Sequence, residues 1–128
     1  MDIEKYLYIP FGDNVELGEL NCWGLVRKFY KEELNILLPE IMLNSENLQQ
    51  IVPTIELYQK NDWEICSIPT LYSVAAMSHK NRPHHVGIFI GNGLILHTAE
   101  GVNTTISDKD NLQDMGFKVL NYWRYKNA

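Results

Sequence analysis

The chain is poor in cysteine, in positive charge and in long apolar runs, and each shortage argues against a class of protein. Two cysteines, Cys22 and Cys66, occur in 128 residues, too few for the disulfide framework of a small secreted domain. Eleven Lys and Arg against sixteen Asp and Glu give a net charge of -5, which does not favour a nucleic-acid partner. Charged residues interrupt every apolar stretch well before the about 18 residues of a membrane span.

The first residues, Met1 to Lys5, also lack the basic, apolar and small-residue segments of a secretory signal. We therefore expect synthesis in a reducing cytosol and two free thiols. Apolar residues, in contrast, are abundant: 45% of the chain is hydrophobic and 11% is aromatic. With no internal repeat or linker, this content predicts one globular domain over residues 1–128.

The order of the periodic patterns predicts an α+β fold. Asn21 is suited to cap a helix that ends near Asn35, because apolar residues recur between them at helical spacing. A second helical pattern starts at about Ser45 and is interrupted by Pro53. Five later apolar runs indicate strands: Leu71 to Met77, His85 to Ile90, Leu94 to Thr98, Val102 to Ile106 and Lys118 to Tyr125. We expect N-terminal helices packed on an antiparallel sheet of about five strands.

Cys22 is the residue that most strongly indicates chemistry, because it would lie in the first turn of the predicted helix. The unpaired amides and the dipole of a helix N-terminus favour an anion, so they would lower the pKa of the thiol and could hold an oxyanion. A buried, inert cysteine is the alternative interpretation of the same position. For Cys66 we expect only a buried small hydrophobe.

A nucleophilic thiol needs a base, and histidine is the usual one near neutral pH. Four histidines are available: His79, His84, His85 and His97. His85 and His97 fall on adjacent predicted strands with Gly87 between them, so His85 could take the thiol proton while His97 orients its ring. Strand alternation directs His84 away from His85, and His79 falls in a polar stretch, so we expect both to be surface residues.

The loop between these two strands decides whether His85 and His97 share a face of the sheet. A two-residue loop, which Asn92-Gly93 by itself favours, would put the two rings on opposite faces. A three-residue loop over 91–93 puts them on one face. Because the chemistry requires a shared face, we predict the three-residue loop or a bulge, with both rings directed toward Cys22. A zinc site made of these three residues is disfavoured, because the paired ligand spacings of structural zinc sites are missing.

Three motifs in this order resemble a known family, the NlpC-type cell-wall cysteine peptidases. Asn21 to Val26 is similar to the family's Asp-Cys-(Ser/Trp/Tyr)-Gly-Leu-Val nucleophile motif. His85 to Gly91 resembles its His-Val-Gly-Ile-Tyr-Ile-Gly strand, and Ile95-Leu96-His97 resembles the strand that carries the third catalytic residue. The spacing of 12 residues from His85 to His97 is the one that the resemblance requires. The similarity extends from about Tyr8 to Tyr125.

The resemblance implies a papain-like fold and a cysteine peptidase that cleaves peptidoglycan stem peptides, typically between γ-D-glutamate and a diamino acid, without a metal or another cofactor. It implies that Cys22 is the nucleophile, that His85 is the base and then the acid, and that His97 orients His85. The substrate-binding residues that it implies are Phe11, Trp23 and Gly87.

The sequence departs from the family pattern at three places. Asn21 stands where Asp is usual, and it can cap the helix but adds no charge. Phe11 stands where many relatives have a Tyr, which removes one hydroxyl from the site. Thr70-Leu71 stands where Gly-Asp is usual, and nothing in the sequence explains this change. None of the three removes the nucleophile or the base.

Further segments resemble the NlpC-type module of phage tail-assembly and tail-tip proteins: Trp23, Arg27 to Tyr30, Leu38-Pro39, Ile9 to Phe11 and Tyr122 to Tyr125. This resemblance implies an enzyme made in the host cytoplasm and carried in the virion, with tail-tip proteins as partners besides the stem peptide. It agrees with the lack of a secretory signal. One alternative is a structural tail component with the same fold and weak or no hydrolysis. Another is a cytosolic peptidase for recycled wall peptides, which does not agree with Trp23.

Overall fold

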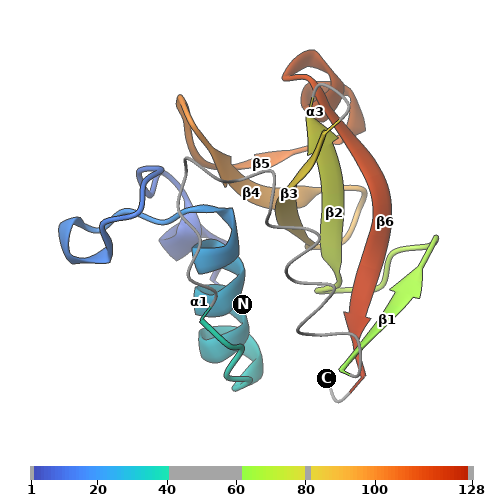
Figure 1. Cartoon of the computed structure of the whole chain (residues 1–128), viewed down its shortest axis with the longest axis horizontal. Helices are drawn as coiled ribbons and strands as arrows, with labels where there is room; N and C mark the ends of the chain where they lie inside the picture. The colour runs from blue at the N-terminus through green and yellow to red at the C-terminus, as the bar shows by residue number, and fades with distance from the viewer. Residues whose placement is uncertain (1, 41–61, 80–81, 127–128) are drawn as a thin grey trace.

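One antiparallel sheet of six strands forms the centre of the molecule (Figure 1). The computed structural model describes residues 2–40, 62–79 and 82–126. The strand order is β1-β6-β2-β3-β4-β5. The strands are β1 (Trp63–Cys66), β2 (Val74–His79), β3 (Arg82–Phe89), β4 (Ile95–Ala99), β5 (Val102–Ser107) and β6 (Phe117–Tyr125). The helices are α1 (Cys22–Leu34) and α3 (Lys109–Asp114), with 3-10 turns η1 (Ile3–Tyr6) and η2 (Val15–Leu17). The α+β class is therefore confirmed.

The structure corrects the sequence prediction at several elements. The sheet has six strands where about five were expected, because the four-residue edge strand β1, paired only with β6, is too short to show a clear alternation. Leu71 lies in a turn and not in a strand, since β2 begins at Val74. Helix α3 has six residues and was missed for the same reason of length. The second predicted helix, with Ser45 and Pro53, lies outside the described residues.

Helix α1 forms as its sequence predicts. The Asn21 side chain accepts a hydrogen bond from the Gly24 amide at 2.8 Å and caps the first turn. Asn35 ends the helix in the left-handed conformation, at φ 55°. One side of the helix is buried and packs against the sheet, through Cys22, Trp23, Leu25, Val26, Phe29 and Tyr30.

The two faces of the sheet contribute to two separate apolar clusters, as the alternation of strand side chains requires. The cluster with α1 takes Trp63, Val74, Ala76, Val86, Ile88, Leu96 and Trp123 from the strands. The other cluster includes Leu112 of α3 and takes Ala75, Met77, Ile95 and Phe117 from the strands. Consecutive residues such as Ala75 and Ala76 therefore serve opposite cores, which fixes the register of each strand.

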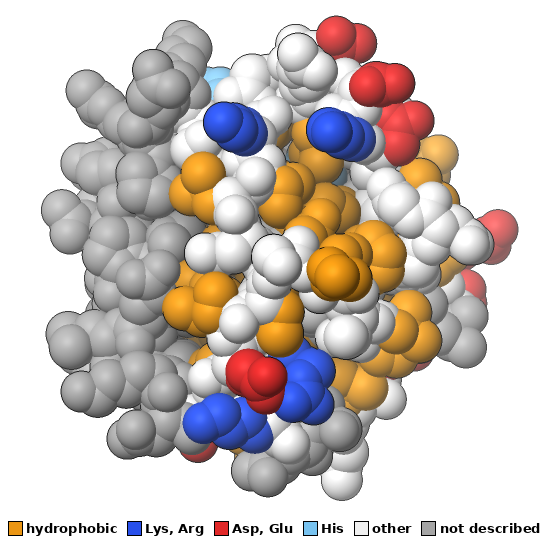
Figure 2. Space-filling view, turned by 90° about the vertical axis from the view of Figure 1, so that its right-hand side faces the viewer, with side chains coloured by type: hydrophobic (Ala, Val, Ile, Leu, Met, Phe, Trp, Pro, Cys, Tyr) orange, Lys and Arg blue, Asp and Glu red, His pale blue; other side chains and the backbone are white. Residues whose placement is uncertain are grey.

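Figure 2 shows the side of the molecule that lies to the right in Figure 1, where β6 and β1 run. Hydrophobic side chains gather in the middle of this side, and charged side chains lie at its two ends. Ile65 of β1 and Leu120 of β6 are exposed, and Arg124 of β6 forms an ion pair with Glu64 of β1. Charges on the edge strand hinder pairing with another chain. No helix in residues 2–40, 62–79 and 82–126 is long and apolar enough to cross a membrane.

Candidate active site

The hairpin between β3 and β4 has the three-residue loop that the chemistry requires. The Ile90 amide donates to the Leu94 carbonyl at 3.0 Å, and residues 91–93 turn between them with φ values of 94°, 56° and 73°. All three residues are left-handed, a conformation that suits glycine and asparagine. The strand register that follows puts His85 and His97 on one face, so the predicted loop and the shared face are confirmed. That both rings are directed toward Cys22 stays a prediction.

His85 and His97 form a buried hydrogen-bonded pair. Nε2 of His85 lies 3.1 Å from Nδ1 of His97, and the rings meet edge to face. The exposed fractions of the two side chains are 2% and 0%. Burial lowers the pKa of His97 to about 4, so its ring is neutral near pH 7. The pair is thus an oriented imidazole next to a neutral polar partner, which is the arrangement expected of a base and its orienting residue.

Ser107 extends this pair, and the sequence did not reveal it. Its Oγ lies 3.0 Å from Nε2 of His97, and its side chain is buried. The register explains the contact: Thr105 pairs with His97, and Ser107 is two residues further along the same face of β5. A diagonal search from His97 across the predicted neighbouring strand would have found Ser107, but that strand was expected to end at Ile106.

The Phe117 ring packs against the face of the His85 ring. The two rings are stacked, with centroids 4.3 Å apart and an angle of 21° between their planes. Phe117 also touches the edge of His97 and the ring of His79, whose centroid is 4.9 Å away. The expectation that His79 is a surface loop residue is therefore wrong: it ends β2 and is partly buried against Phe117. The side chain of His84 lies outside the described part of the chain.

Gly87 has no room for a side chain. A Cβ at this position would lie 2.7 Å from Cγ2 of Ile95 and 3.1 Å from Cβ of His97. The missing side chain therefore lets β4 bring His97 up to His85, which is a packing reason for the glycine. The substrate contact implied for Gly87 stays a prediction.

Cys22 lies in the first turn of α1, with 1% of its surface exposed. Burial raises the pKa of its thiol to about 11, and the backbone amides of Val86, Trp23 and Cys22 only partly oppose this effect. The expectation of a lowered pKa is therefore wrong for this structure, because desolvation outweighs the helix terminus. The Val86 amide that reaches the thiol belongs to the residue after His85. The contact between the thiol and the His85 ring itself stays a prediction.

Asp13 brings a negative charge close to Cys22. The Asn21 side chain donates to Oδ1 of Asp13 at 3.2 Å, and the Asp13 carboxylate contributes to the raised pKa of the Cys22 thiol. Asn21 thus caps the helix with its oxygen and holds Asp13 with its nitrogen. Asn21 carries no charge, and the Asp13 carboxylate, in the loop before α1, provides a negative charge beside it.

The remaining candidate residues, Trp23, Phe11 and Cys66, differ in how deeply they are buried. Trp23 is buried in the core, and its Nε1 donates to the Pro39 carbonyl at 3.1 Å. Phe11 is half-buried and bridges to Leu20 just before α1. Substrate contact by either residue stays a prediction, and the burial of Trp23 favours packing. Cys66 is half-buried on the edge strand, so its expected full burial is wrong.

The polar groups of the site are engaged with one another and not arranged around a metal. In the described ranges, no group of three or more His, Cys, Asp or Glu side chains is placed to hold a metal ion. Both ring nitrogens of His97 and Nε2 of His85 lie in hydrogen bonds. These hydrogen bonds fix the orientation of both imidazole rings.

Residues 8–121 match the model of the NlpC/P60 family. The chain belongs to the NlpC/P60 family. This match includes Cys22, His85 and His97 and covers most of the chain, which supports a hydrolase of the cysteine-peptidase type. No curated protein matches the sequence. A solved structure that is similar to this NlpC/P60 chain is the crystal structure of the NlpC/p60 domain of peptidoglycan hydrolase SagA, with a TM-score of 0.59 and 16% sequence identity, over 94% of this chain and 89% of that chain. The likeness shows the papain-like fold.

Proposed function

We propose that this protein is a peptidoglycan endopeptidase that cleaves stem peptides between γ-D-glutamate and the diamino acid, with Cys22 as nucleophile and His85 as base. The main observation behind the proposal is the buried hydrogen bond between His85 and His97. His85 lies on β3, and the backbone amide of the next residue, Val86, contacts the Cys22 thiol. Membership of the NlpC/P60 family and the fold shared with a peptidoglycan hydrolase support the same substrate class.

The protonation states define how the reaction would begin. Near pH 7 the Cys22 thiol is protonated, because burial raises its pKa to about 11. Since Nε2 of His85 is engaged by His97, Nδ1 is the ring nitrogen that would accept the thiol proton. Sulfur then bonds to the peptide carbonyl carbon. His85 returns the proton to the leaving amine as the carbon–nitrogen bond breaks, which leaves a thioester on Cys22. Water, deprotonated by His85, then attacks the thioester and releases the acid and the thiol.

The first turn of α1 supplies the donors for the oxyanion. The Gly24 amide donates to the Asn21 side chain at 2.8 Å, and the Leu25 amide donates to the Asn21 carbonyl at 3.0 Å. The amides of Cys22 and Trp23 precede them and are directed at the thiol, where they lower its pKa. Two amides at a helix N-terminus can stabilise the negative oxygen that forms when sulfur attacks the carbonyl.

A digestion experiment tests this function. Purified peptidoglycan and a soluble disaccharide tetrapeptide are incubated with the protein, and the products are identified by mass spectrometry. We expect fragments that end at D-glutamate and fragments that begin with the diamino acid, and none of them with Cys22→Ala. Cleavage at another bond would correct the assigned bond, and the absence of fragments with the unchanged protein would contradict the enzyme assignment.

The same proposal assigns the enzyme to a phage tail, with tail-tip proteins as its partners. Its support is the resemblance of five segments, among them Trp23, Leu38-Pro39 and Tyr122 to Tyr125, to tail-associated modules. Mass spectrometry of purified virions from a lysogen that carries this sequence is the test. Peptides of this chain should co-purify with the tail, and their absence from intact particles would contradict the assignment.

A structural tail component is the second candidate function, and one observation favours it. The Cys22 side chain is only 1% exposed, so its sulfur can reach a substrate only if neighbouring groups move. The departures at Phe11 and Thr70-Leu71 agree with weak chemistry. The two candidates differ in turnover: a structural component would be found in the tail while its purified form leaves peptidoglycan intact.

A further inference from the structure

We infer that Ser107 is a positioning residue of this site, which permits the tautomer of His97 that leaves His85 able to act as the base. The inference rests on the proposed cysteine-peptidase function, because it concerns the base of that reaction. Its basis is a line of two hydrogen bonds. Oγ of Ser107 lies 3.0 Å from Nε2 of His97, whose Nδ1 lies 3.1 Å from Nε2 of His85.

The whole line is withdrawn from water, so a ring N–H that lacks a protein acceptor is costly. The exposed fractions of Ser107, His97 and His85 are 3%, 0% and 2%. Burial lowers the pKa of His97 to about 4, so near pH 7 the ring is neutral and carries a single N–H. A neutral ring between two partners can direct this hydrogen to only one of them. The line of hydrogen bonds therefore has two possible directions.

The two directions differ in what they leave to His85. In the first, Nε2–H of His97 donates to Ser107 Oγ, and Nε2–H of His85 donates to Nδ1 of His97. Neutral His85 then has its lone pair on Nδ1, where it can accept the thiol proton of Cys22. In the second, the Ser107 hydroxyl donates to His97, and Nδ1–H of His97 donates to His85. Neutral His85 then carries its hydrogen on Nδ1 and cannot act as the base.

Ser107 makes the first direction available because its oxygen can accept. Without this oxygen, the Nε2–H of His97 would be a buried donor with no acceptor, which is costly. The His97 ring would therefore change to the Nδ1–H form and donate to His85, which is the direction that disables the base. Removal of one hydroxyl that never touches the substrate should thus lower the rate of the chemical step.

The strand register provides a matched control on the same strand. Thr105 pairs directly with His97, whereas Ser107 pairs with Ile95, yet the hydrogen bond to His97 comes from Ser107. Both residues carry a hydroxyl on the same face of β5, but only one of them is in the line. Thr105→Ala therefore removes a neighbouring hydroxyl and should leave the tautomers unchanged.

The test is the tautomer of His97, measured by 15N NMR of histidine-labelled protein, together with kcat and KM on the disaccharide tetrapeptide. In the unchanged protein we expect the Nε2–H form of His97. Ser107→Ala should convert it to the Nδ1–H form and reduce kcat by about 10- to 10,000-fold, the upper end being the loss known for a catalytic histidine in the wrong tautomer, with KM nearly unchanged. Ser107→Thr should restore the tautomer and the rate, and Thr105→Ala should change neither.

Three results would overturn the inference. The first is an Nδ1–H ring for His97 in the unchanged protein, which needs no variant and so is decisive even where Ser107→Ala does not fold. The second is a Ser107→Ala variant that keeps its full rate. The third is a loss of rate in Ser107→Ala with the Nε2–H tautomer retained, which would assign Ser107 to packing alone. If the unchanged protein does not cleave peptidoglycan, the proposed function fails, while the 15N spectra still decide the role of Ser107.

Discussion

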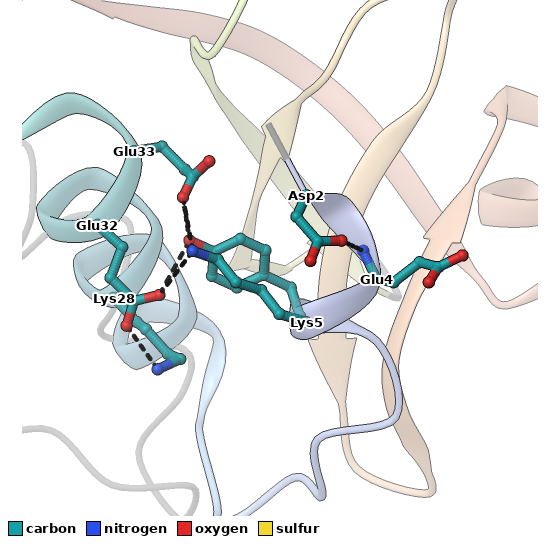
Figure 3. A network of polar contacts seen from close by, with 7 residues as sticks. Asp2, Glu4, Lys5, Lys28, Glu32 and Glu33 are labelled. Carbon is teal, nitrogen blue, oxygen red and sulfur yellow. Dashed lines mark hydrogen bonds and ion pairs between the residues drawn. The ribbon is translucent and has the colours of Figure 1, made fainter.

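Two polar clusters of the molecule, one buried and one exposed, are held together in different ways. The buried one is the line Ser107–His97–His85, in which the central ring is neutral and the side chains are covered. The exposed one joins η1 to α1 (Figure 3) and is open to water at Lys5, Lys28 and Glu32, while Glu33 is mostly covered and Tyr6 is buried. Lys5 pairs with Glu33 at 2.9 Å and Lys28 with Glu32 at 2.6 Å, and the Tyr6 hydroxyl donates to both carboxylates.

The charges of the exposed cluster persist because water and counter-charges stabilise them. Hydrogen bonds from Lys28 and Lys5 lower the pKa values of Glu32 and Glu33 respectively. Exposed ion pairs of this kind contribute little each and are screened by salt. In the buried line, removal of one member leaves a partner without a hydrogen bond and without access to water. We therefore expect substitutions in the buried line to affect activity strongly and those in the exposed cluster to affect stability mildly.

Cys22→Ala should have the largest effect, because it removes the nucleophile itself. We expect no detectable cleavage of peptidoglycan, with the far-UV circular dichroism and Tm close to those of the unchanged protein, since only one sulfur atom is lost. Cys66→Ala is the matched control, because Cys66 lies on the edge strand β1, and it should keep full activity. Cleavage by Cys22→Ala above the background would exclude the cysteine mechanism.

His85→Ala should lower kcat/KM by about 100- to 10,000-fold, the range typical of a general base. The thiol has a pKa of about 11, so few molecules ionise near pH 7 without a base. The remaining activity should therefore rise with pH as the thiol ionises by itself. Strand alternation predicts that the neighbouring variant, His84→Ala, is nearly silent. Equal losses in the two variants would show that the wrong histidine has been assigned.

The buried line should also make stability depend on pH in a defined window. The pKa of His97 is lowered to about 4 in the folded protein, while an unfolded histidine titrates near about 6.5. Between these values the unfolded chain binds more protons, so stability is complete above about 6.5 and is lost as the pH falls toward 4. The loss is on the order of 3 kcal/mol. Urea unfolding at several pH values should show this slope, and His97→Gln should abolish most of it.

His97→Gln should lose less activity than His85→Ala, because the amide oxygen of glutamine can still accept a hydrogen bond from the His85 ring. A measurable fraction of the cleavage rate should therefore remain. A pH slope of unchanged size in His97→Gln would show that another group causes it.

Local sequence signals were sufficient for the parts of the fold that local chemistry determines. The cap at Asn21 and the left-handed end at Asn35 depend on a few neighbouring residues, so α1 was predicted at both ends. Strand β1 and helix α3 were missed because they are short and are stabilised by their packing on β6 and on the sheet. The hairpin was predicted only by requiring His85 and His97 to share a face, against the local preference of Asn92-Gly93.

Residues of the candidate site could be proposed from the sequence where their side-chain type indicates chemistry, but not where only their position in the fold does. Cys22, His85 and His97 carry nucleophilic or basic groups, so their spacing could be interpreted. Ser107 and Phe117 are ordinary strand residues that only the strand register and the ring stacking of the folded chain bring to the two histidines. The raised pKa of the Cys22 thiol was also unpredictable, since the sequence shows the helix terminus but not the depth of burial.

Tyr6→Phe should have the smallest effect, and it addresses the exposed cluster. The ring keeps its contact with Phe29, with centroids 5.2 Å apart, so only the hydroxyl and its hydrogen bonds to Glu32 and Glu33 are lost. We expect a loss of about 1 kcal/mol in the free energy of unfolding near pH 7, with no change in peptidoglycan cleavage. The folded pKa values of both glutamates are lowered, so the stability they contribute is present above about 4.3, the unfolded value, and is lost as the pH falls through the folded values. The difference between Tyr6→Phe and the unchanged protein should therefore shrink below about pH 4, a window lower than that of His97. Urea unfolding at pH 7 and pH 3.5 measures it, and an equal difference at both values would show that the hydroxyl acts independently of the two carboxylates.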